Sequence, residues 1–216
     1  MCLPSFSGFL LEKEYDMITR AVEQPSRPFV AVMGGAKVSD KISLIRQLIT
    51  RADRILIGGA MANTFLKFKS YSVGRSVAEG DQQELLREIY QMAADKVGPE
   101  GVDDFLVLPT DVAVGANTTD ASQVRCEVPI DKIADEDMAL DIGSQTIDRF
   151  SAIIKDARTV VWNGPVGLSS LKAFSYGSAR VALAMAANDQ AVSIVGGGDT
   201  ADFVLKWGGD QEANFT

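Results

Sequence analysis

Four short hydrophobic runs recur along the chain, and each ends at a glycine turn that is followed by a helical pattern. The runs are Phe29 to Met33, Ile55 to Ile57, Val160 to Trp162 and Val192 to Val195. Runs this short and this apolar are typical of strands that are buried on both faces. Strands that alternate with helices form a parallel sheet, and right-handed crossovers then place all four glycine turns at one edge of it.

Apolar residues at helical spacing predict helices over residues 41–51, 82–96, 147–154 and 200–207. We expect Asp81 and Glu84 to form a capping pair for the second helix and Ser144 to cap the third. Gly208 is expected to end the fourth.

The middle of the chain has a different pattern. The residues from Phe105 to Leu108, Asp111 to Val114 and Val124 to Val128 suggest strands joined by short polar turns, which we interpret as a small β excursion beside the main sheet. No stretch rich in Pro, Gly and Ser divides the chain. The predicted fold is therefore one α/β domain, a three-layer αβα Rossmann-like arrangement with a mainly parallel central sheet.

The composition narrows the possible functions. The 216 residues carry 29 acidic and 21 basic side chains, a net charge of -8, which disfavours binding to nucleic acid or to an anionic membrane surface. No apolar run is long enough to span a membrane, and the N-terminus lacks the hydrophobic region of a signal peptide. Two cysteines, Cys2 and Cys126, stand in no paired motif, which argues against a disulfide framework. The absence of histidine rules out a His-based catalytic triad and a His-bearing zinc site. We expect a cytoplasmic protein.

The segment from Val32 to Lys41 has the sharpest candidate chemistry. Gly34 and Gly35 end a buried strand, so backbone amides there can approach a bulky anion. The following helix directs its dipole and free amides at the same place, and Lys37 and Lys41 are spaced to add two positive charges. The segment favours a polyphosphate ligand. The alternative is that the glycines serve tight packing and the lysines are solvated.

A second glycine segment, from Ser193 to Thr200, offers another amide cradle. Gly197 and Gly198 lie in a run of three glycines at a strand end, Asp199 can bind Mg²⁺, and Thr200 can contact a phosphate at the helix start. The alternative for Asp199 alone is a plain helix N-cap.

The other two turns are less specific. Asn163 precedes the rigid Gly164-Pro165 turn and could hold a phosphate or a sugar, although a structural turn explains it equally well. Gly58 and Gly59 could line a purine face or allow close packing of a helix on a strand. Neither G-x-x-x-x-G-K-[ST] nor a helix-opening G-x-G-x-x-G occurs. These absences argue against a P-loop protein and against an NAD-dependent oxidoreductase.

Together these segments resemble the C-terminal, nucleotide-binding domain of phosphoglycerate kinase. The matching motifs are GGAKVSDK, IGGAMANTF, LDIG from Leu140 to Gly143, VVWNGPVG and VGGGDT, in family order. The resemblance implies that residues 1–14 lead in from an interdomain region and that residues 15–216 form the nucleotide-binding domain, truncated at its end. It also implies a two-domain enzyme that transfers the acyl phosphate of 1,3-bisphosphoglycerate to ADP, giving ATP and 3-phosphoglycerate.

The resemblance implies a role for each matched residue. Lys37 would be catalytic, steadying the transferring phosphoryl group, and Asp199 would bind the Mg²⁺ of the nucleotide. Lys41 and Asn163 would contact the phosphates, whose terminal groups would lie on the cradle of Gly197, Gly198 and Thr200. The adenine and ribose pocket would be formed by Gly34, Gly35, Gly58, Gly59, Leu140, Pro165 and Gly167.

The chain also departs from the family pattern. The matching motifs all belong to the C-terminal domain, so we expect this chain to lack the family's N-terminal domain, which binds 3-phosphoglycerate or 1,3-bisphosphoglycerate. Ser169 and Ser170 stand where the family usually has a Phe-Glu pair, whose carboxylate accepts hydrogen bonds from the ribose. We therefore expect weak binding of Mg·ADP or Mg·ATP without turnover by the chain alone, with Lys37, Gly198 and Thr200 facing one patch. The alternative is a non-catalytic nucleotide-binding or scaffold protein of the same fold.

Overall fold

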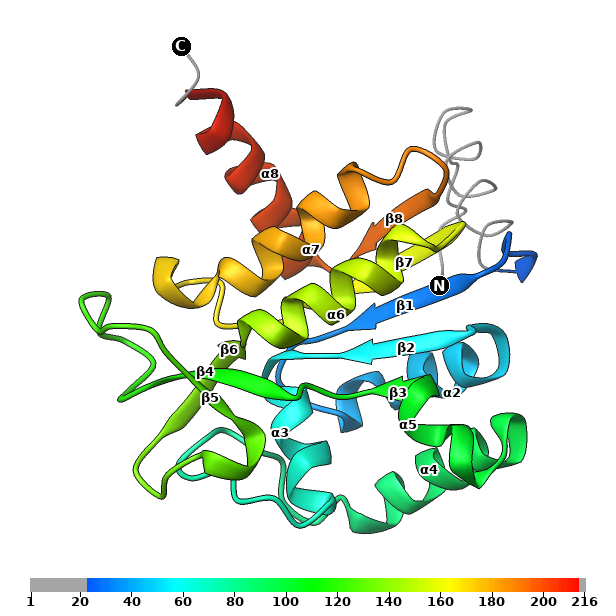
Figure 1. The fold of residues 1–216 in the computed structure, drawn as a ribbon, viewed down its shortest axis with the longest axis horizontal. Coiled ribbons are helices and arrows are strands. Elements are labelled where there is room, and N and C mark those ends of the chain that lie inside the picture. Colours follow the sequence, from blue (N-terminus) through cyan, green and yellow to red (C-terminus); the bar gives the residue numbers. More distant parts are fainter. Residues whose placement is uncertain (1–22, 214–216) are drawn as a thin grey trace, which may run out of the picture.

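A five-stranded parallel sheet in the order β3-β2-β1-β7-β8 forms the centre of the fold (Figure 1). The computed structural model describes residues 23–213, so the expected lead-in at residues 1–14 lies outside the described residues. The strands are β1 (Phe29–Met33), β2 (Arg54–Ile57), β3 (Leu106–Val107), β7 (Thr159–Asn163) and β8 (Val192–Gly196). The four predicted strands and their parallel arrangement are confirmed.

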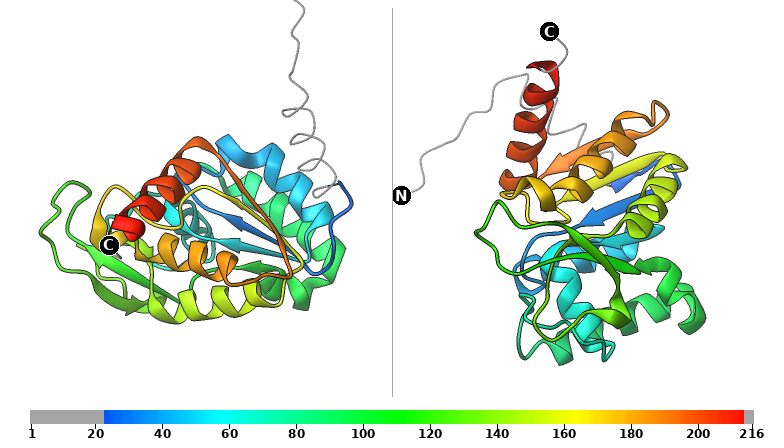
Figure 2. Two further views of the ribbon diagram at one scale, coloured as in Figure 1. Left: turned by 90° about the horizontal axis from the view of Figure 1, so that it is seen from above. Right: turned by 60° about the vertical axis from the view of Figure 1, so that its left-hand side comes forward.

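Helices cover both faces of this sheet, as the two directions of the β1 side chains show. Phe29 and Met33 pack into one apolar cluster, whereas Val30 and Val32 pack into another on the opposite face. The first cluster is completed by α2 (Ile42–Arg51), α3 (Gly59–Phe68), α4 (Gln83–Val97) and α5 (Val102–Phe105). The second is completed by α6 (Ser144–Lys155), α7 (Tyr176–Ala186) and α8 (Gly198–Ala213). The predicted three-layer αβα architecture is therefore confirmed (Figure 2).

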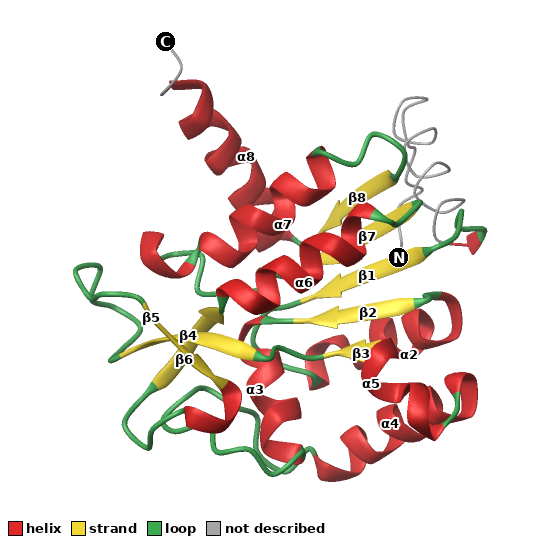
Figure 3. Cartoon of the chain, viewed as in Figure 1, coloured by secondary structure: helices red, strands yellow, loops and turns green. Residues whose placement is uncertain are grey.

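A second, antiparallel sheet lies beside the first in the order β5-β4-β6 (Figure 3). Its strands are β4 (Asp111–Gly115), β5 (Cys126–Pro129) and β6 (Met138–Ile142). The predicted β excursion is confirmed, but its composition was partly wrong. The segment at Leu106 pairs in parallel with β2 in the main sheet, and β6 takes the third place instead.

The predicted helix ends were less accurate than the helices themselves. Neither α4 nor α6 has a side-chain cap from its own N-cap residue, so the predicted capping roles of Asp81 and Ser144 are wrong. The amides that open α6 are bound by carboxylates from the small sheet: Glu127 accepts from Ser144 at 3.0 Å and Asp111 from Thr146 at 2.8 Å.

The last helix also ends later than predicted. α8 continues past Gly208 to Ala213, because a single glycine costs a helix only about 1 kcal/mol relative to alanine and does not by itself end it. α8 projects away from the sheet (Figure 1). Among the helices between residues 23 and 213, none is both long and apolar enough to cross a membrane. Four short 3-10 turns complete the described chain: η1 (Ser39–Lys41), η2 (Pro99–Gly101), η3 (Ile130–Lys132) and η4 (Lys172–Phe174).

Candidate functional site

A cleft of about 1050 Å³ opens where the parallel strands end, and we call it the strand-end cleft. Six of the predicted site residues line it: Gly35, Gly59, Leu140, Pro165, Gly167 and Asp199. They follow β1, β2, β7 and β8 or lie on β6, so the expectation that the four glycine turns meet at one sheet edge is confirmed. Ser169 and Ser170 also line the cleft.

The turns after β1 and β7 are joined by backbone hydrogen bonds. The amide of Gly34 donates to the carbonyl of Asn163 at 3.0 Å, and the amide of Gly35 donates to Pro165 at 2.8 Å. A Cβ atom on Gly34 would lie 2.1 Å from the Pro165 carbonyl oxygen, so only glycine allows this approach. These two amides are therefore occupied and do not form the open cradle that the sequence suggested.

The turn after β2 is held in the same way. Gly59, at φ +65°, donates its amide to Val166 at 2.8 Å, and the amide of Gly58 donates to Met33 at 2.8 Å. A Cβ atom on Gly58 would lie 2.6 Å from the Cβ of Val166. Gly34 and Gly58 thus match the close-packing alternative, while Gly35 and Gly59 also present their backbone to the cleft.

The amides that open η1 are occupied by a carboxylate from a distant segment. Glu79 accepts from the amides of Val38 at 2.8 Å and Ser39 at 3.1 Å, and also from the Ser39 hydroxyl. The expectation of free amides at this helix start was therefore wrong. Burial raises the pKa of Glu79, but these hydrogen bonds and the charge of Lys37 outweigh it, so the pKa lies below its usual value. The exposed Lys37 thus lies on the side of η1 that faces Glu79.

Lys41 lies in a different environment from Lys37. Its ammonium group donates to the carbonyl oxygens of Gly34 at 2.8 Å and Asn163 at 3.1 Å, and so links the turns after β1 and β7. Burial lowers the pKa of Lys41, and the charge of Asp199 partly offsets this effect. The Lys41 ammonium is therefore near enough to Asp199, which lines the cleft, for the two charges to interact.

The start of α8 differs from the turns after β1 and β2. Gly197 has φ +87°, and a Cβ atom on Gly198 would have no heavy atom within 4 Å. The first amides of any α-helix lack a carbonyl four residues earlier, so those that follow Gly197 have no partner within their own helix. Asp199 is exposed, whereas Thr200 is fully buried and its Oγ1 accepts from the amide of Gly164 at 2.7 Å. The Asn163 side-chain amide lies beside Gly196 and Gly197.

These positions bear on only part of the expectation that Lys37, Gly198 and Thr200 face one patch. Lys41 links the turns after β1 and β7, and Thr200 binds the turn after β7 from the start of α8. The charge of Lys37 acts on Glu79, near the turn after β1. The ligand roles of all these residues remain predictions.

Several side chains around the cleft were missed in the sequence. Lys172, Tyr176 and Trp207 line it, but none of them lies within one of the four glycine turns. Asp141 lies behind the cleft within the LDIG motif, and its side chain is fully buried. Burial raises the pKa of Asp141 to about 7, although the Gly177 amide and Arg125 act in the opposite direction. The sequence did contain a signal for Asp141, because it is the one charged residue in an otherwise apolar strand.

Comparison with known proteins identifies the family to which this geometry belongs. The family model described as phosphoglycerate kinase matches residues 1–216. Phosphoglycerate kinase from Moorella thermoacetica is 47% identical over 206 residues, covering 95% of this chain and 50% of the relative. Phosphoglycerate kinase from Enterococcus faecalis is 44% identical over 206 residues, covering 95% of this chain and 49% of the relative.

Solved structures give the same result. Phosphoglycerate kinase from Coxiella burnetii superimposes with a TM-score of 0.85 at 37% identity, covering 93% of this chain and 50% of that one. The enzyme from Pyrococcus horikoshii OT3 gives a TM-score of 0.73 at 29% identity, with 93% and 49% covered. The chain therefore spans about half the length of the relatives that it matches.

Proposed function

The chain belongs to the phosphoglycerate kinase family, and we propose that it is the nucleotide-binding half of such an enzyme, which holds Mg·ADP or Mg·ATP in the strand-end cleft. The observation that carries the proposal is the meeting of Gly35, Gly59, Pro165 and Asp199 in one cleft of about 1050 Å³. Ligand pockets of roughly 300 to 1,000 Å³ bury most of a drug-sized molecule, so the cleft is large enough for a nucleotide.

The phosphates would lie at the start of α8. Unpaired amides after Gly197 and the positive end of the helix dipole favour an anion there. An ammonium group has three donors, and two of those on Lys41 bind carbonyl oxygens, which leaves one for a phosphate. Lys37 is exposed and would reach the terminal, transferring phosphoryl group from the turn after β1.

Asp199 would hold the magnesium ion together with phosphate oxygens and water. Among residues 23–213, no group of three or more Asp, Glu, Cys or His side chains could hold a metal by itself. The exposed carboxylate of Asp199 beside an anion site suits an ion that arrives with the nucleotide. The ion supplies neutralisation of the phosphate charge.

The sugar and base would occupy the outer part of the cleft. Gly167 and Leu140 offer a flat backbone and an apolar surface, and Ser169 and Ser170 offer hydroxyl groups to the ribose. A hydrogen bond to an ionised carboxylate is roughly twice as strong as one between neutral hydroxyl groups. The serines would therefore hold the ribose less tightly than the usual glutamate of the family.

In the whole enzyme, the reaction would be glycolytic phosphoryl transfer. A terminal oxygen of ADP attacks the acyl phosphate of 1,3-bisphosphoglycerate, the bond between phosphorus and the acyl oxygen breaks, and the carboxylate of 3-phosphoglycerate leaves. Such a transfer requires mainly positioning and charge neutralisation, not a protein nucleophile. The acyl phosphate would be held by the other half of the enzyme, so we expect no turnover by this chain alone.

Titration calorimetry tests the binding proposal. We expect Mg·ADP to bind with a Kd on the order of tens of micromolar to millimolar, or roughly 4 to 6 kcal/mol. Lys37→Ala should weaken binding while leaving the fold intact. An absence of heat with both Mg·ADP and Mg·ATP at millimolar concentration would refute the proposal.

A coupled kinase assay tests the expectation that the chain alone does not turn over. We expect no ATP formation from the chain alone, and formation of ATP when a matching N-terminal domain is added. Turnover without that domain would contradict the proposed division of the site. Nucleotide binding that never supports turnover with the added domain would favour the non-catalytic alternative.

A further inference from the structure

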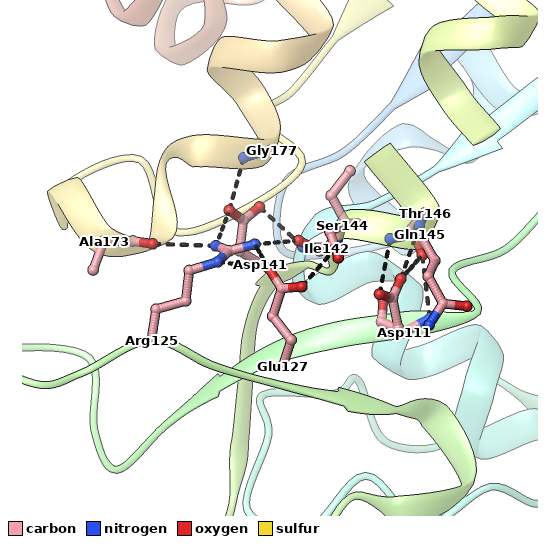
Figure 4. A network of polar contacts seen from close by, with 10 residues as sticks. All are labelled: Asp111, Arg125, Glu127, Asp141, Ile142, Ser144, Gln145, Thr146, Ala173 and Gly177. Carbon is pink, nitrogen blue, oxygen red and sulfur yellow. Dashed lines mark hydrogen bonds and ion pairs between the residues drawn. The ribbon is translucent and has the colours of Figure 1, made fainter. Parts of the chain in front are cut away.

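The half-buried Arg125 forms an ion pair with the buried Asp141, next to residues that line the strand-end cleft. Figure 4 shows the polar contacts of this pair. Asp141 of β6 accepts hydrogen bonds from Arg125 Nη1 at 2.7 Å, from the amide of Gly177 at 2.8 Å and from the amide of Ile142 at 2.9 Å. All of these partners are donors, so they match an ionised carboxylate. A buried charge is tolerated when it is paired and its remaining lone pairs are satisfied, as here.

Two segments of the cleft wall pack directly on this carboxylate. A Cβ atom on Gly167 would lie 2.1 Å from Asp141 Oδ1, and one on Gly177 would lie 2.4 Å from the same oxygen. Gly167 lines the cleft, and Gly177 belongs to the first turn of α7. The position of the backbone at both glycines is therefore set by where Asp141 lies.

Arg125 fixes the rest of the same wall. Its guanidinium group donates to the carbonyl of Ala173 at 3.1 Å and to that of Ile142 at 2.7 Å, and it contacts Glu127 at 3.0 Å. The guanidinium carbon also lies 5.4 Å from the centre of the Tyr176 ring, a cation–π distance. Tyr176 lines the cleft and is 48% exposed.

The contacts of this pair are confined to one side of the cleft. They reach Gly167, η4 and the start of α7, but among the described residues none of them reaches the start of α8 or the turn after β1. The pair is thus placed to influence the part of a ligand that lies away from the phosphates.

We propose that Arg125 and Asp141 are positioning residues, which hold the cleft wall that receives the sugar and base of the nucleotide. The inference rests on the proposed function. It makes the small antiparallel sheet part of the nucleotide site, because Arg125 precedes β5 and Asp141 lies in β6. The pair contributes to affinity for the nucleoside and leaves affinity for the phosphate groups unchanged.

Two ligands separate these contributions in titration calorimetry: Mg·ADP, and Mg·pyrophosphate, which lacks sugar and base. We expect Arg125→Met and Asp141→Asn to raise the Kd of Mg·ADP roughly tenfold, and that of Mg·pyrophosphate less than twofold. Arg125→Lys keeps a charge near Asp141 but loses the forked geometry of the guanidinium, so its Kd for Mg·ADP should lie between those of wild type and Arg125→Met. Arg46→Met, which breaks the exposed Arg46–Glu88 pair at 2.7 Å, is the matched control and should change neither Kd.

The outcomes distinguish the proposals. Equal losses for both ligands, or an unchanged Kd for Mg·ADP, would overturn the positioning role. Should Asp141→Asn or Arg125→Met fail to fold, the same comparison of the two Kd values is made with Arg125→Lys. Failure of the wild-type chain to bind Mg·ADP would refute the proposed function itself. Wild-type binding with a selective loss of Mg·ADP in the variants supports both.

Discussion

Replacement of Lys41 by methionine tests whether this lysine links two turns of the sheet edge even when no nucleotide is bound. The Lys41 ammonium group donates to the carbonyl oxygens of Gly34 and Asn163 at 2.8 and 3.1 Å. Lys37 lies four residues earlier in the same motif and is exposed. Lys37→Met is therefore a matched control, with the same substitution in the same segment.

The expected loss of stability follows from these contacts. A hydrogen bond to a charged group contributes about 1.5–3 kcal/mol, so two of them give roughly 3–6 kcal/mol. Part of this is recovered, because methionine removes the cost of burying the ammonium group, which lowers the pKa of Lys41. We expect a net loss of about 2–4 kcal/mol for Lys41→Met. An exposed side chain such as Lys37 should contribute less than about 0.5 kcal/mol.

Urea unfolding of the nucleotide-free protein measures this difference. Trp162 is fully buried and its indole nitrogen donates to the carbonyl of Gly164 at 2.8 Å, so its fluorescence reports on the turn that Lys41 holds. With an m-value of about 2 kcal/mol/M, Lys41→Met should lower the unfolding midpoint by roughly 1–2 M. A midpoint within about 0.25 M of wild type, or an equal shift in Lys37→Met, would refute the reasoning.

Three further predictions concern the same sheet edge. Gly34→Ala should destabilise the fold by about 2 kcal/mol or more in urea unfolding, because its Cβ would lie 2.1 Å from a Pro165 backbone oxygen; Gly80→Ala, with open space around its Cβ, should not. Glu79 has a lowered pKa, so it adds stability that is fully present above its usual pKa and is lost as pH falls through the folded pKa. Glu79→Gln should therefore be less stable than wild type at pH 7. In thermal unfolding, the difference in melting temperature between the two proteins should become smaller below pH 4. Asp199→Ala should abolish the gain in ADP affinity that Mg²⁺ provides, as measured by calorimetry with and without EDTA; an undiminished gain would exclude this carboxylate as the metal ligand.

Four strands of the central sheet, and the meeting of their glycine turns at one side of it, were predictable because the signals are local. Val30 and Val32 alternate with Phe29 and Met33 in a run that is apolar on both sides, and such a run fits only a strand covered by two layers of helices. The glycine turns that follow the strands converge because parallel strands end at the same edge. The meeting of Gly35, Gly59 and Asp199 in one cleft follows from this topology.

Most of the errors, apart from the end of α8, have a different cause, which is that the deciding partner is distant in the sequence. Glu79 reaches the amides of η1 from about 40 residues away, and Asp111 caps α6 from a similar distance. A glycine pair at a strand end predicts close approach of something to the backbone, but it does not say whether that is a phosphate or another turn. At Gly34 and Gly58 it is another turn.

In the small sheet and the strand before it, contacts with distant residues also decide the structure. Leu106 and Val107 form a two-residue strand whose place is decided by its pairing with Ile55 and Leu56, not by its own composition. Arg125 lies between a polar loop and an exposed strand, and nothing in that stretch indicates that it pairs with the buried Asp141. Such a pair can be identified only from the three-dimensional structure.

The central claim is that nucleotide phosphates bind at the start of α8, with the nucleoside in the strand-end cleft. Titration of the ¹⁵N-labelled chain with Mg·ADP, followed by amide chemical shifts, tests it directly. The account predicts the largest shifts at Gly197, Gly198 and Asp199 and smaller shifts at Gly167. It predicts none at Asp53, which binds Phe29 at the opposite end of the parallel strands. Shifts that cluster around Asp53 and leave the start of α8 unchanged would contradict it.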